Sequence, residues 1–193
     1  MKLKKVESII KKSKSVAIVG NGGAVWIGNE QAMYPTYFEQ MNFDTLMTVF
    51  DLDDEKRESI TEVPSELIAR ADTADSCIGE RLLKRHPIRI VWTGQPLVGL
   101  FEENGAQEIL FVNEKYLLPL ADAKDGVELY LRRDSAGKAY VAVKSGMLLI
   151  GLVEPEPIID ETFMQHFKRL YELSEFTLQN QPAAPDLQEH ING

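Results

Sequence analysis

Lysines recur on one side of the helix predicted at residues 3–12, and a row of this kind can bind a polyanion. The apolar residues of this segment recur at helical spacing and define one face: Leu3, Val6, Ile9 and Ile10. Four lysines fall on the opposite face: Lys4, Lys5, Lys11 and Lys12. A lysine row of this kind binds phosphates by displacing condensed counterions, so its affinity falls with salt. A solvated surface helix has the same pattern, and composition leaves both interpretations open.

A second basic group, Arg81, Lys84 and Arg85, lies at the end of a helix predicted over residues 65–85. That helix is inferred from the spacing of Leu67, Ile68, Ala71, Ala74, Ile78 and Leu82. Pro87 is expected to end it, because proline clashes with the preceding turn. Cations at a helix C-terminus also interact favourably with the helix dipole, and this stabilisation alone would explain the three basic residues without any function. The functional hypothesis is that two basic helices hold nucleic acid on one surface.

The sequence Gly20-Asn21-Gly22-Gly23 follows a β-rich run, as in the opening of a dinucleotide-binding fold. That fold needs a third glycine and a helix, whereas Val25 and the residues after it continue as strand. Asn-Gly supplies the positive φ angles of a tight turn. The glycines therefore predict a hairpin of residues 16–19 and 24–27.

No residue set predicts a metal site, a cofactor site or an enzyme. Asp51, Asp53, Glu55 and Glu62 follow calcium-loop spacing, but Lys56 stands where that loop needs glycine. The three histidines, His86, His166 and His190, lack zinc-site spacing. Nucleophile-elbow and P-loop motifs do not occur in the sequence. Cys77 falls on the inner side of its predicted helix and is expected to be structural.

Composition narrows the class of protein. The 193 residues are 44% hydrophobic and 26% charged, and 30 acids against 21 bases give a net charge of -9. A surface that is basic all over is therefore excluded, and a polyanion must meet a local patch. A lone cysteine predicts a reducing compartment, with the cytoplasm as the default. The longest apolar run, residues 147–153, is too short to span a bilayer, so no membrane association is expected.

The remaining elements predict an α+β fold with mostly antiparallel sheets and helices on one face. A short helix is expected over residues 43–50 with Asn42 as N-cap, an acidic turn over residues 51–62, and a helix over residues 114–121 weakened by Pro119. Strands are expected at residues 88–92, 97–101, 108–112, 127–132, 139–143 and 147–153. Asp160 is expected to cap a final helix with an aromatic stripe. That stripe and Trp26, Tyr34 and Trp92 are expected in the core.

Three segments in the second half form a recognisable series: FVNEKYLL at 111–118, VELYL at 127–131 and MLLIGLVEP at 147–155. With the strand before them, residues 109–155 resemble the last domain of DNA sliding clamps. The resemblance implies helices that line a basic hole and acidic outer sheets, which fits two cationic segments in an acidic protein. Clamps of bacteria have three such domains in a chain, and this chain has room for at most two.

These observations predict an organisation and two functions. The expected divisions are an N-terminal half (1–86), a β-rich half ending in a helix (87–178) and a disordered tail (179–193). The resemblance implies a non-catalytic, clamp-like module that contacts duplex DNA without sequence preference, and a homo-oligomer is among the states that it implies. The alternative is a protein-interaction module with no nucleic-acid binding, which uses an acidic surface or the final aromatic helix to bind a protein partner.

Overall fold

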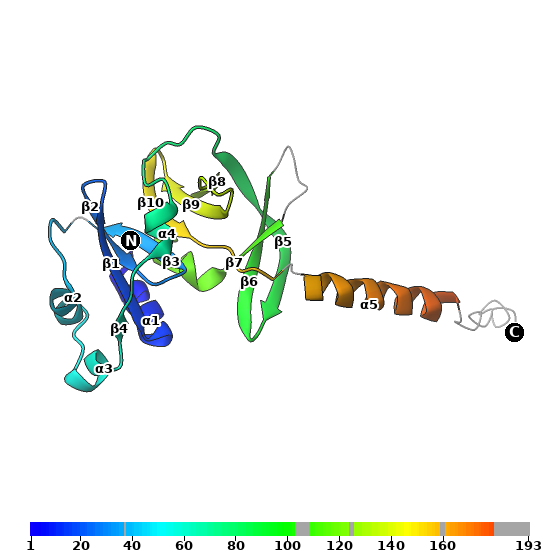
Figure 1. The fold of residues 1–193 in the computed structure, drawn as a ribbon, viewed down its shortest axis with the longest axis horizontal. Helices are drawn as coiled ribbons and strands as arrows, with labels where there is room; N and C mark the ends of the chain where they lie inside the picture. The colour runs from blue at the N-terminus through cyan, green and yellow to red at the C-terminus, as the bar shows by residue number, and fades with distance from the viewer. Residues whose placement is uncertain (37, 103–108, 124–125, 159–160, 180–193) are drawn as a thin grey trace, which may run out of the picture. The chain divides into compact units, whose positions relative to one another are not determined.

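The computed structural model describes residues 1–36, 38–102, 109–123, 126–158 and 161–179 (Figure 1). The helices are α1 (Leu3–Ser13), α2 (Phe43–Val49), α3 (Asp54–Glu58), α4 (Glu66–Arg70), the 3₁₀ turns η1 (Glu114–Tyr116) and η2 (Leu118–Leu120), and α5 (Glu161–Gln179). The strands are β1 (Ser15–Asn21), β2 (Ala24–Gly28), β3 (Ala32–Thr36), β4 (Thr61–Glu62), β5 (Arg81–Trp92), β6 (Gln95–Glu102), β7 (Ile109–Asn113), β8 (Glu128–Arg133), β9 (Ala139–Ser145) and β10 (Leu148–Val153).

The strands that the structure describes form one sheet in the order β4-β1-β2-β3-β10-β9-β8-β5-β6-β7. Only the short β1–β4 pair is parallel. The α+β class with mostly antiparallel pairing is therefore confirmed. The predicted β1–β2 hairpin is also present, with Asn21 opposite Ala24. Gly22 and Gly23 form its two-residue turn, with φ of 60° and 80°, which explains why glycine occupies both positions.

A helical segment followed by a three-stranded meander occurs twice in the chain. The first copy is α1 with β1, β2 and β3, and the second is η1 and η2 with β8, β9 and β10. The third strands of the two copies, β3 and β10, pair antiparallel, so β1-β2-β3 is mirrored by β10-β9-β8. The helical segments meet as well: the Lys2 backbone N–H donates to the Pro119 carbonyl at 2.8 Å. The fold thus contains an internal two-fold repeat.

Neighbouring strand residues supply separate apolar clusters on the two sides of the sheet, as the alternation of strand side chains requires. Val16 and Ile27 belong to the larger cluster with α1 and α2, whereas Ala17 and Trp26 belong to the smaller one. Leu67 of α4 packs in the smaller cluster. Helices therefore cover both faces of the sheet, not one face as the sequence suggested.

The helix predicted over residues 65–85 is wrong beyond its first turns. Ser65 caps α4 by accepting a hydrogen bond from the Ile68 N–H, but the helix ends at Arg70. A loop follows, and residues 81–92 form strand β5. Pro87 does not end a helix; it lies where the β5–β6 register shifts between Arg85 and Arg89, a position where a missing N–H costs no ladder bond.

The predicted cap of α2 is confirmed, and the segment 114–121 is helical over two short turns. Asn42 caps α2 by accepting from the Thr45 N–H at 2.9 Å, as expected. The 114–121 segment forms two 3₁₀ turns, with Pro119 at the start of the second. Strand β3 was not predicted from the sequence, because Ala32–Thr36 is short and contains Pro35.

The expected division at residue 86 falls inside β5, and the strands of both halves share one sheet. Instead, residues 1–156 form one compact unit and residues 157–193 form another. The second unit contains α5. The predicted tail, apart from Gln179, lies outside the described residues.

The predicted aromatic core is correct in the first unit for Trp26 and Tyr34, which are 2% and 0% exposed. Trp92 is 41% exposed at the end of β5, so its prediction is wrong. In α5, the side chains of Leu170, Tyr171 and Leu173 are exposed within their own unit.

Candidate nucleic-acid interface

Helix α1 presents the lysine face that its sequence pattern predicts. Val6, Ile9 and Ile10 are buried against the sheet and η2. The four lysines predicted on the opposite side are all exposed: Lys4, Lys5, Lys11 and Lys12. Lys14 caps the C-terminal end of the helix: it adopts φ of 55° and donates its N–H to the Ile10 carbonyl. Lys14 is exposed too and extends the basic surface by one residue.

Three of these four lysines have no ion-pair partner within the described residues. The Lys11 ammonium contacts Glu7 one turn earlier, at 2.5 Å, which neutralises one charge of the face. Lys4, Lys5 and Lys12 make no such pair with any described carboxylate. Unpaired, solvated ammonium groups on one helix face attract phosphates without fixing a sequence.

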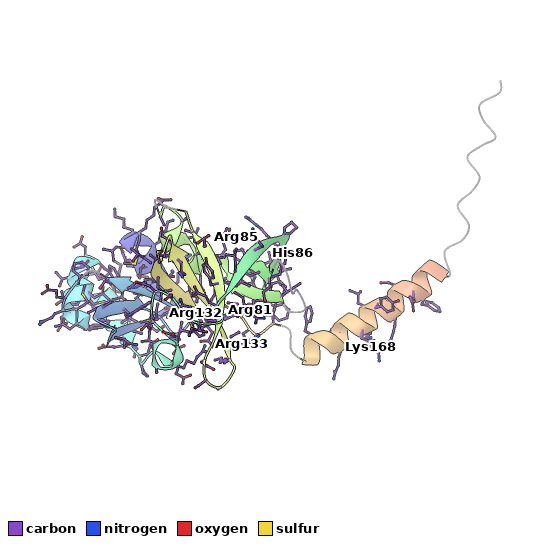
Figure 2. The ribbon with its side chains drawn as sticks, turned by 90° about the horizontal axis from the view of Figure 1, so that it is seen from above. Arg81, Arg85, His86, Arg132, Arg133 and Lys168 are labelled. Atoms are coloured by element: carbon purple, nitrogen blue, oxygen red, sulfur yellow. The ribbon has the colours of Figure 1, made fainter. Side chains whose placement is uncertain are left out.

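The second predicted group is placed differently from expectation. Arg81, Lys84 and Arg85 lie on strand β5, so they do not form a basic helix end. Arg81 is paired with Glu102 at 2.9 Å. Arg81 and Arg85 lie along β5 in Figure 2, where His86 follows them.

Strand order separates the two basic groups. Strands β2, β3, β10, β9 and β8 lie between β1, against which α1 packs, and β5. The structure therefore does not bring the seven predicted residues together as two parallel helices. The α1 face is the coherent basic surface among the described residues, and the β5 group is a separate basic strand.

Arg132 organises a buried ionic cluster that was not predicted from the sequence. Its side chain is 0% exposed and donates to the Glu80 carboxylate from Nε at 2.8 Å and from Nη2 at 2.6 Å. Lys144 donates to the other Glu80 oxygen at 2.8 Å. Arg132 also donates to the backbone carbonyls of Asp72, Ala74 and Asp75. The cluster fixes the loop between α4 and β5 on the sheet.

The charge state of the cluster follows from these contacts. Burial by itself raises the pKa of Glu80, but hydrogen bonds from Lys144 and Arg132 outweigh that effect and lower the pKa. Glu80 is thus a carboxylate that balances two cations. Every strong donor of Arg132 is used inside the protein, so the group is structural and offers no site for an external anion.

Cys77 lies in the same loop and is only partly buried, so its placement on an inner helix side is wrong. Burial raises the pKa of the Cys77 thiol, and a hydrogen bond with Asp72 raises it further. A raised pKa disfavours the thiolate that nucleophilic chemistry requires. The nearby Arg132 charge acts in the opposite direction, but the pKa of the thiol stays raised, so nucleophilic use of Cys77 is disfavoured.

The acidic segment 51–62 has a structural role, because it contains the short helix α3 and the residue that caps it. Asp53 accepts a hydrogen bond from the Lys56 N–H at 2.9 Å at the start of α3, and the Lys56 ammonium pairs with its carboxylate. Within the described part of the chain, no three carboxylate, histidine or cysteine side chains converge as metal ligands do. The expected absence of a metal or cofactor stays a prediction.

Comparison with known proteins adds no assignment: no family model, no curated protein and no solved structure matches this chain. Among the helices described, none is both long enough and apolar enough to cross a bilayer.

Proposed function

We propose that this protein is a non-catalytic, DNA-associated module that contacts duplex DNA through phosphates in a sequence-independent way, resembling a sliding clamp. The observation that carries the proposal is the α1 face, on which Lys4, Lys5 and Lys12 are exposed and unpaired within the described residues. In a protein with a net charge of -9, such a local surface is where a polyanion meets attraction instead of repulsion.

The internal repeat supports the proposal at the level of architecture. Two copies of a helical segment with three antiparallel strands, joined where the helical segments touch, are similar to the repeated unit that the clamp resemblance implies. The second copy differs, because η1 and η2 are short and carry no lysine row. DNA contact is therefore assigned chiefly to α1, and Arg81, Lys84 and Arg85 are assigned a lesser, separate contribution.

Encircling a duplex needs several such repeats, so the clamp form of the proposal includes a homo-oligomer. A monomer that lies along DNA needs only the α1 face. A reducing compartment, the cytoplasm, belongs to the same proposal because duplex DNA is met there and the chain has a single cysteine.

The test is binding of a fluorescently labelled duplex at low ionic strength, measured by anisotropy. The triple variant K4E/K5E/K12E should weaken binding at least about tenfold, because each lysine contributes a phosphate contact. The matched control, K138E/K168E/R169E, changes the net charge equally but lies outside α1 and should bind nearly as the wild type does.

The alternative, a protein-interaction module, predicts no retention of duplex by the wild type at any ionic strength. Equal loss of binding in the two triple variants would also contradict the proposal, because it would show that net charge, not the α1 face, governs the interaction. Circular dichroism of each variant establishes that the fold is kept.

A further inference from the structure

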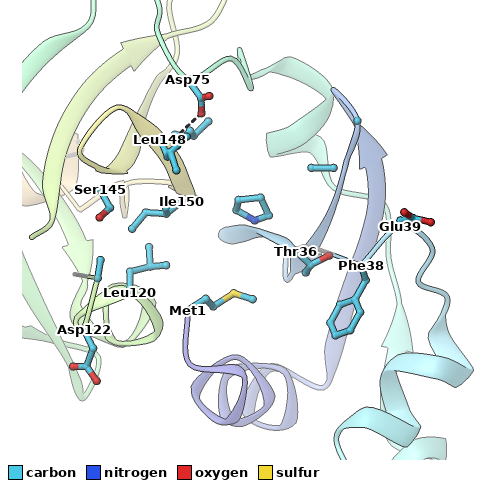
Figure 3. A pocket seen from close by; sticks show the side chains of 15 residues that line it. Met1, Thr36, Phe38, Glu39, Asp75, Leu120, Asp122, Ser145, Leu148 and Ile150 are labelled. Atoms are coloured by element: carbon cyan, nitrogen blue, oxygen red, sulfur yellow. Dashed lines mark hydrogen bonds between the residues drawn. The ribbon is translucent and has the colours of Figure 1, made fainter. Parts of the chain in front are cut away.

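A groove opens where the two halves of the internal repeat meet. Strands β3 and β10 pair only at Met33–Leu152 and Ala32–Val153. Beyond these pairs the register is not continued, and a pocket of about 720 Å³ lies between the end of β3 and the start of β10. Figure 3 shows Thr36 and Phe38 on one side of it and Leu148 and Ile150 on the other.

The floor of the groove is apolar and firmly built. Leu120 of η2 lines it and is 2% exposed. Gly151 allows this close packing, since a Cβ there would stand 2.7 Å from the Leu120 side chain and 3.3 Å from Tyr34. Tyr34 is itself fixed by a hydrogen bond from its hydroxyl to the Tyr116 carbonyl at 2.8 Å.

The walls of the groove carry large apolar side chains that are exposed to solvent. Leu148 is 56% exposed, Met1 is 49% exposed and Phe38 is 42% exposed. Apolar groups gathered around a concavity of this volume are typical of a binding site, because isolated exposed hydrophobic residues do not usually converge.

The rim of the groove is acidic. Glu39, Asp75 and Asp122 line the pocket together with the apolar residues. Asp122 pairs with Lys2, and Asp75 accepts a hydrogen bond from the Leu149 backbone N–H at 2.8 Å. Glu39 is exposed and makes no ion pair with any described residue. Because Lys2 neutralises Asp122, Glu39 and Asp75 give the rim its remaining negative charge, which complements a cationic partner and is opposite in sign to the α1 face.

We propose that this groove binds a short segment of a partner protein that carries large apolar side chains flanked by lysine or arginine. The apolar floor and walls take the apolar side chains, and the acidic rim attracts the flanking cations. An extended segment suits a groove bounded by two diverging strands, because its alternate side chains point into the groove and out of it. The site is independent of the DNA contact on α1 and goes beyond it.

The test uses random dodecapeptides displayed on phage, selected on the full-length protein. The proposal predicts a consensus with two or more Leu, Ile, Phe or Met residues and flanking Lys or Arg. A selected peptide, made synthetically, should then lose at least tenfold in affinity for L148E. It should keep affinity within about twofold for M147E, because Met147 is the adjacent residue, is 83% exposed and does not line the groove.

Both substitutions place a carboxylate at an exposed position, so both variants should melt as the wild type does. A third variant, E39K, should weaken the selected cationic peptide several-fold, since it reverses charge at the rim. An acidic or wholly polar consensus, no enrichment, or equal affinity for L148E and M147E would overturn the proposal. Self-association of the wild type that L148E abolishes and M147E keeps, without peptide enrichment, would instead assign the groove to a second copy of the chain.

Discussion

At the residue scale, Arg132 holds the loop between α4 and β5 in place. It bonds a buried carboxylate and three backbone carbonyls that are distant in the sequence. Replacing it with Met keeps much of the side-chain volume but leaves Glu80 with only Lys144. We expect the variant R132M to lower the free energy of unfolding by about 3–5 kcal/mol, as measured by urea denaturation, because Glu80 loses two of its three charged donors and three backbone carbonyls lose theirs.

The neighbouring residue provides the control for Arg132. Arg133 has the same side chain, but it is exposed and donates a hydrogen bond to the Gly137 carbonyl in the adjacent turn at 2.9 Å. The variant R133M should therefore stay within about 0.5 kcal/mol of the wild type. Similar losses in the two variants would show that the buried cluster does not stabilise the loop.

The lowered pKa of Glu80 predicts how the free energy of unfolding depends on pH. Its folded-state pKa lies below the ordinary value of 4.5, so the unfolded chain binds the proton more readily than the folded protein does. The stabilisation from Glu80 is therefore complete above that value and is lost as the pH falls through the lower, folded-state pKa. In urea unfolding at a series of pH values, E80Q should show a smaller loss of stability on acidification than the wild type.

Part of that acid sensitivity should remain in E80Q, because Asp53 and Asp134 also have lowered pKa values. Hydrogen bonds from Lys56 lower the former, and a hydrogen bond from Arg70 lowers the latter. An unchanged pH profile in E80Q would show that Glu80 titrates alike in the folded and unfolded chains.

At the element scale, the tight β2–β3 connection depends on Gly28. A Cβ at this position would stand 1.9 Å from the Ala32 carbonyl oxygen, which is backbone and cannot turn aside. The Asn29 N–H also donates to that oxygen at 2.9 Å. The variant G28A should therefore lose about 3 kcal/mol of unfolding free energy, as measured by denaturant titration, because the two strands must move apart.

Gly20 on β1 offers a matched comparison in the same sheet. A Cβ there meets no atom within 4 Å, and its φ is not positive. The variant G20A should be neutral or slightly stabilising, since alanine loses less backbone entropy than glycine on folding. A loss in G20A equal to that in G28A would contradict the steric explanation.

The elements predictable from sequence were those governed by local chemistry. The β1–β2 turn needs glycines at positive φ, and α2 needs the Asn42 cap, so both are visible in a few residues. Strand β5 was misread as helix because Leu67, Ile68, Ala71, Ala74, Ile78 and Leu82 follow helical spacing. Its true conformation depends on strand pairing with β6 and on the loop that Arg132 fixes, and such long-range contacts leave no local signal.

The same reasoning applies to the candidate sites. The α1 lysine face was predictable, because helical periodicity places those side chains whatever the rest of the chain does. The Glu80–Arg132–Lys144 cluster and the groove between β3 and β10 were not, because they join residues from separate strands and loops. The β5 basic group was predicted by residue type but assigned to the wrong element.

At the scale of the whole molecule, the first unit carries its own core. Every buried residue that the structure describes in the two apolar clusters lies at or before Val153, within the first unit. Deleting residues 161–193 should leave the free energy of unfolding by urea within about 1 kcal/mol of the full chain. A larger loss would show that the second unit stabilises the first.

The first unit carries opposite charges on two of its surfaces: the α1 face is basic, and the rim of the β3–β10 groove is acidic. Binding of the selected peptide should accordingly be unchanged in K4E/K5E/K12E.

The salt dependence of duplex binding measures how many phosphates the α1 lysines contact. If the three unpaired α1 lysines each contact a phosphate, a plot of log affinity against log salt concentration should have a slope of about −3 for the wild type, since each contact contributes about −0.9. The slope should become much shallower for K4E/K5E/K12E, in which only the lesser contribution of the β5 group remains, and stay near the wild-type value for K138E/K168E/R169E. No measurable binding by the wild type at low salt, or a slope that the α1 substitutions leave unchanged, would contradict the account.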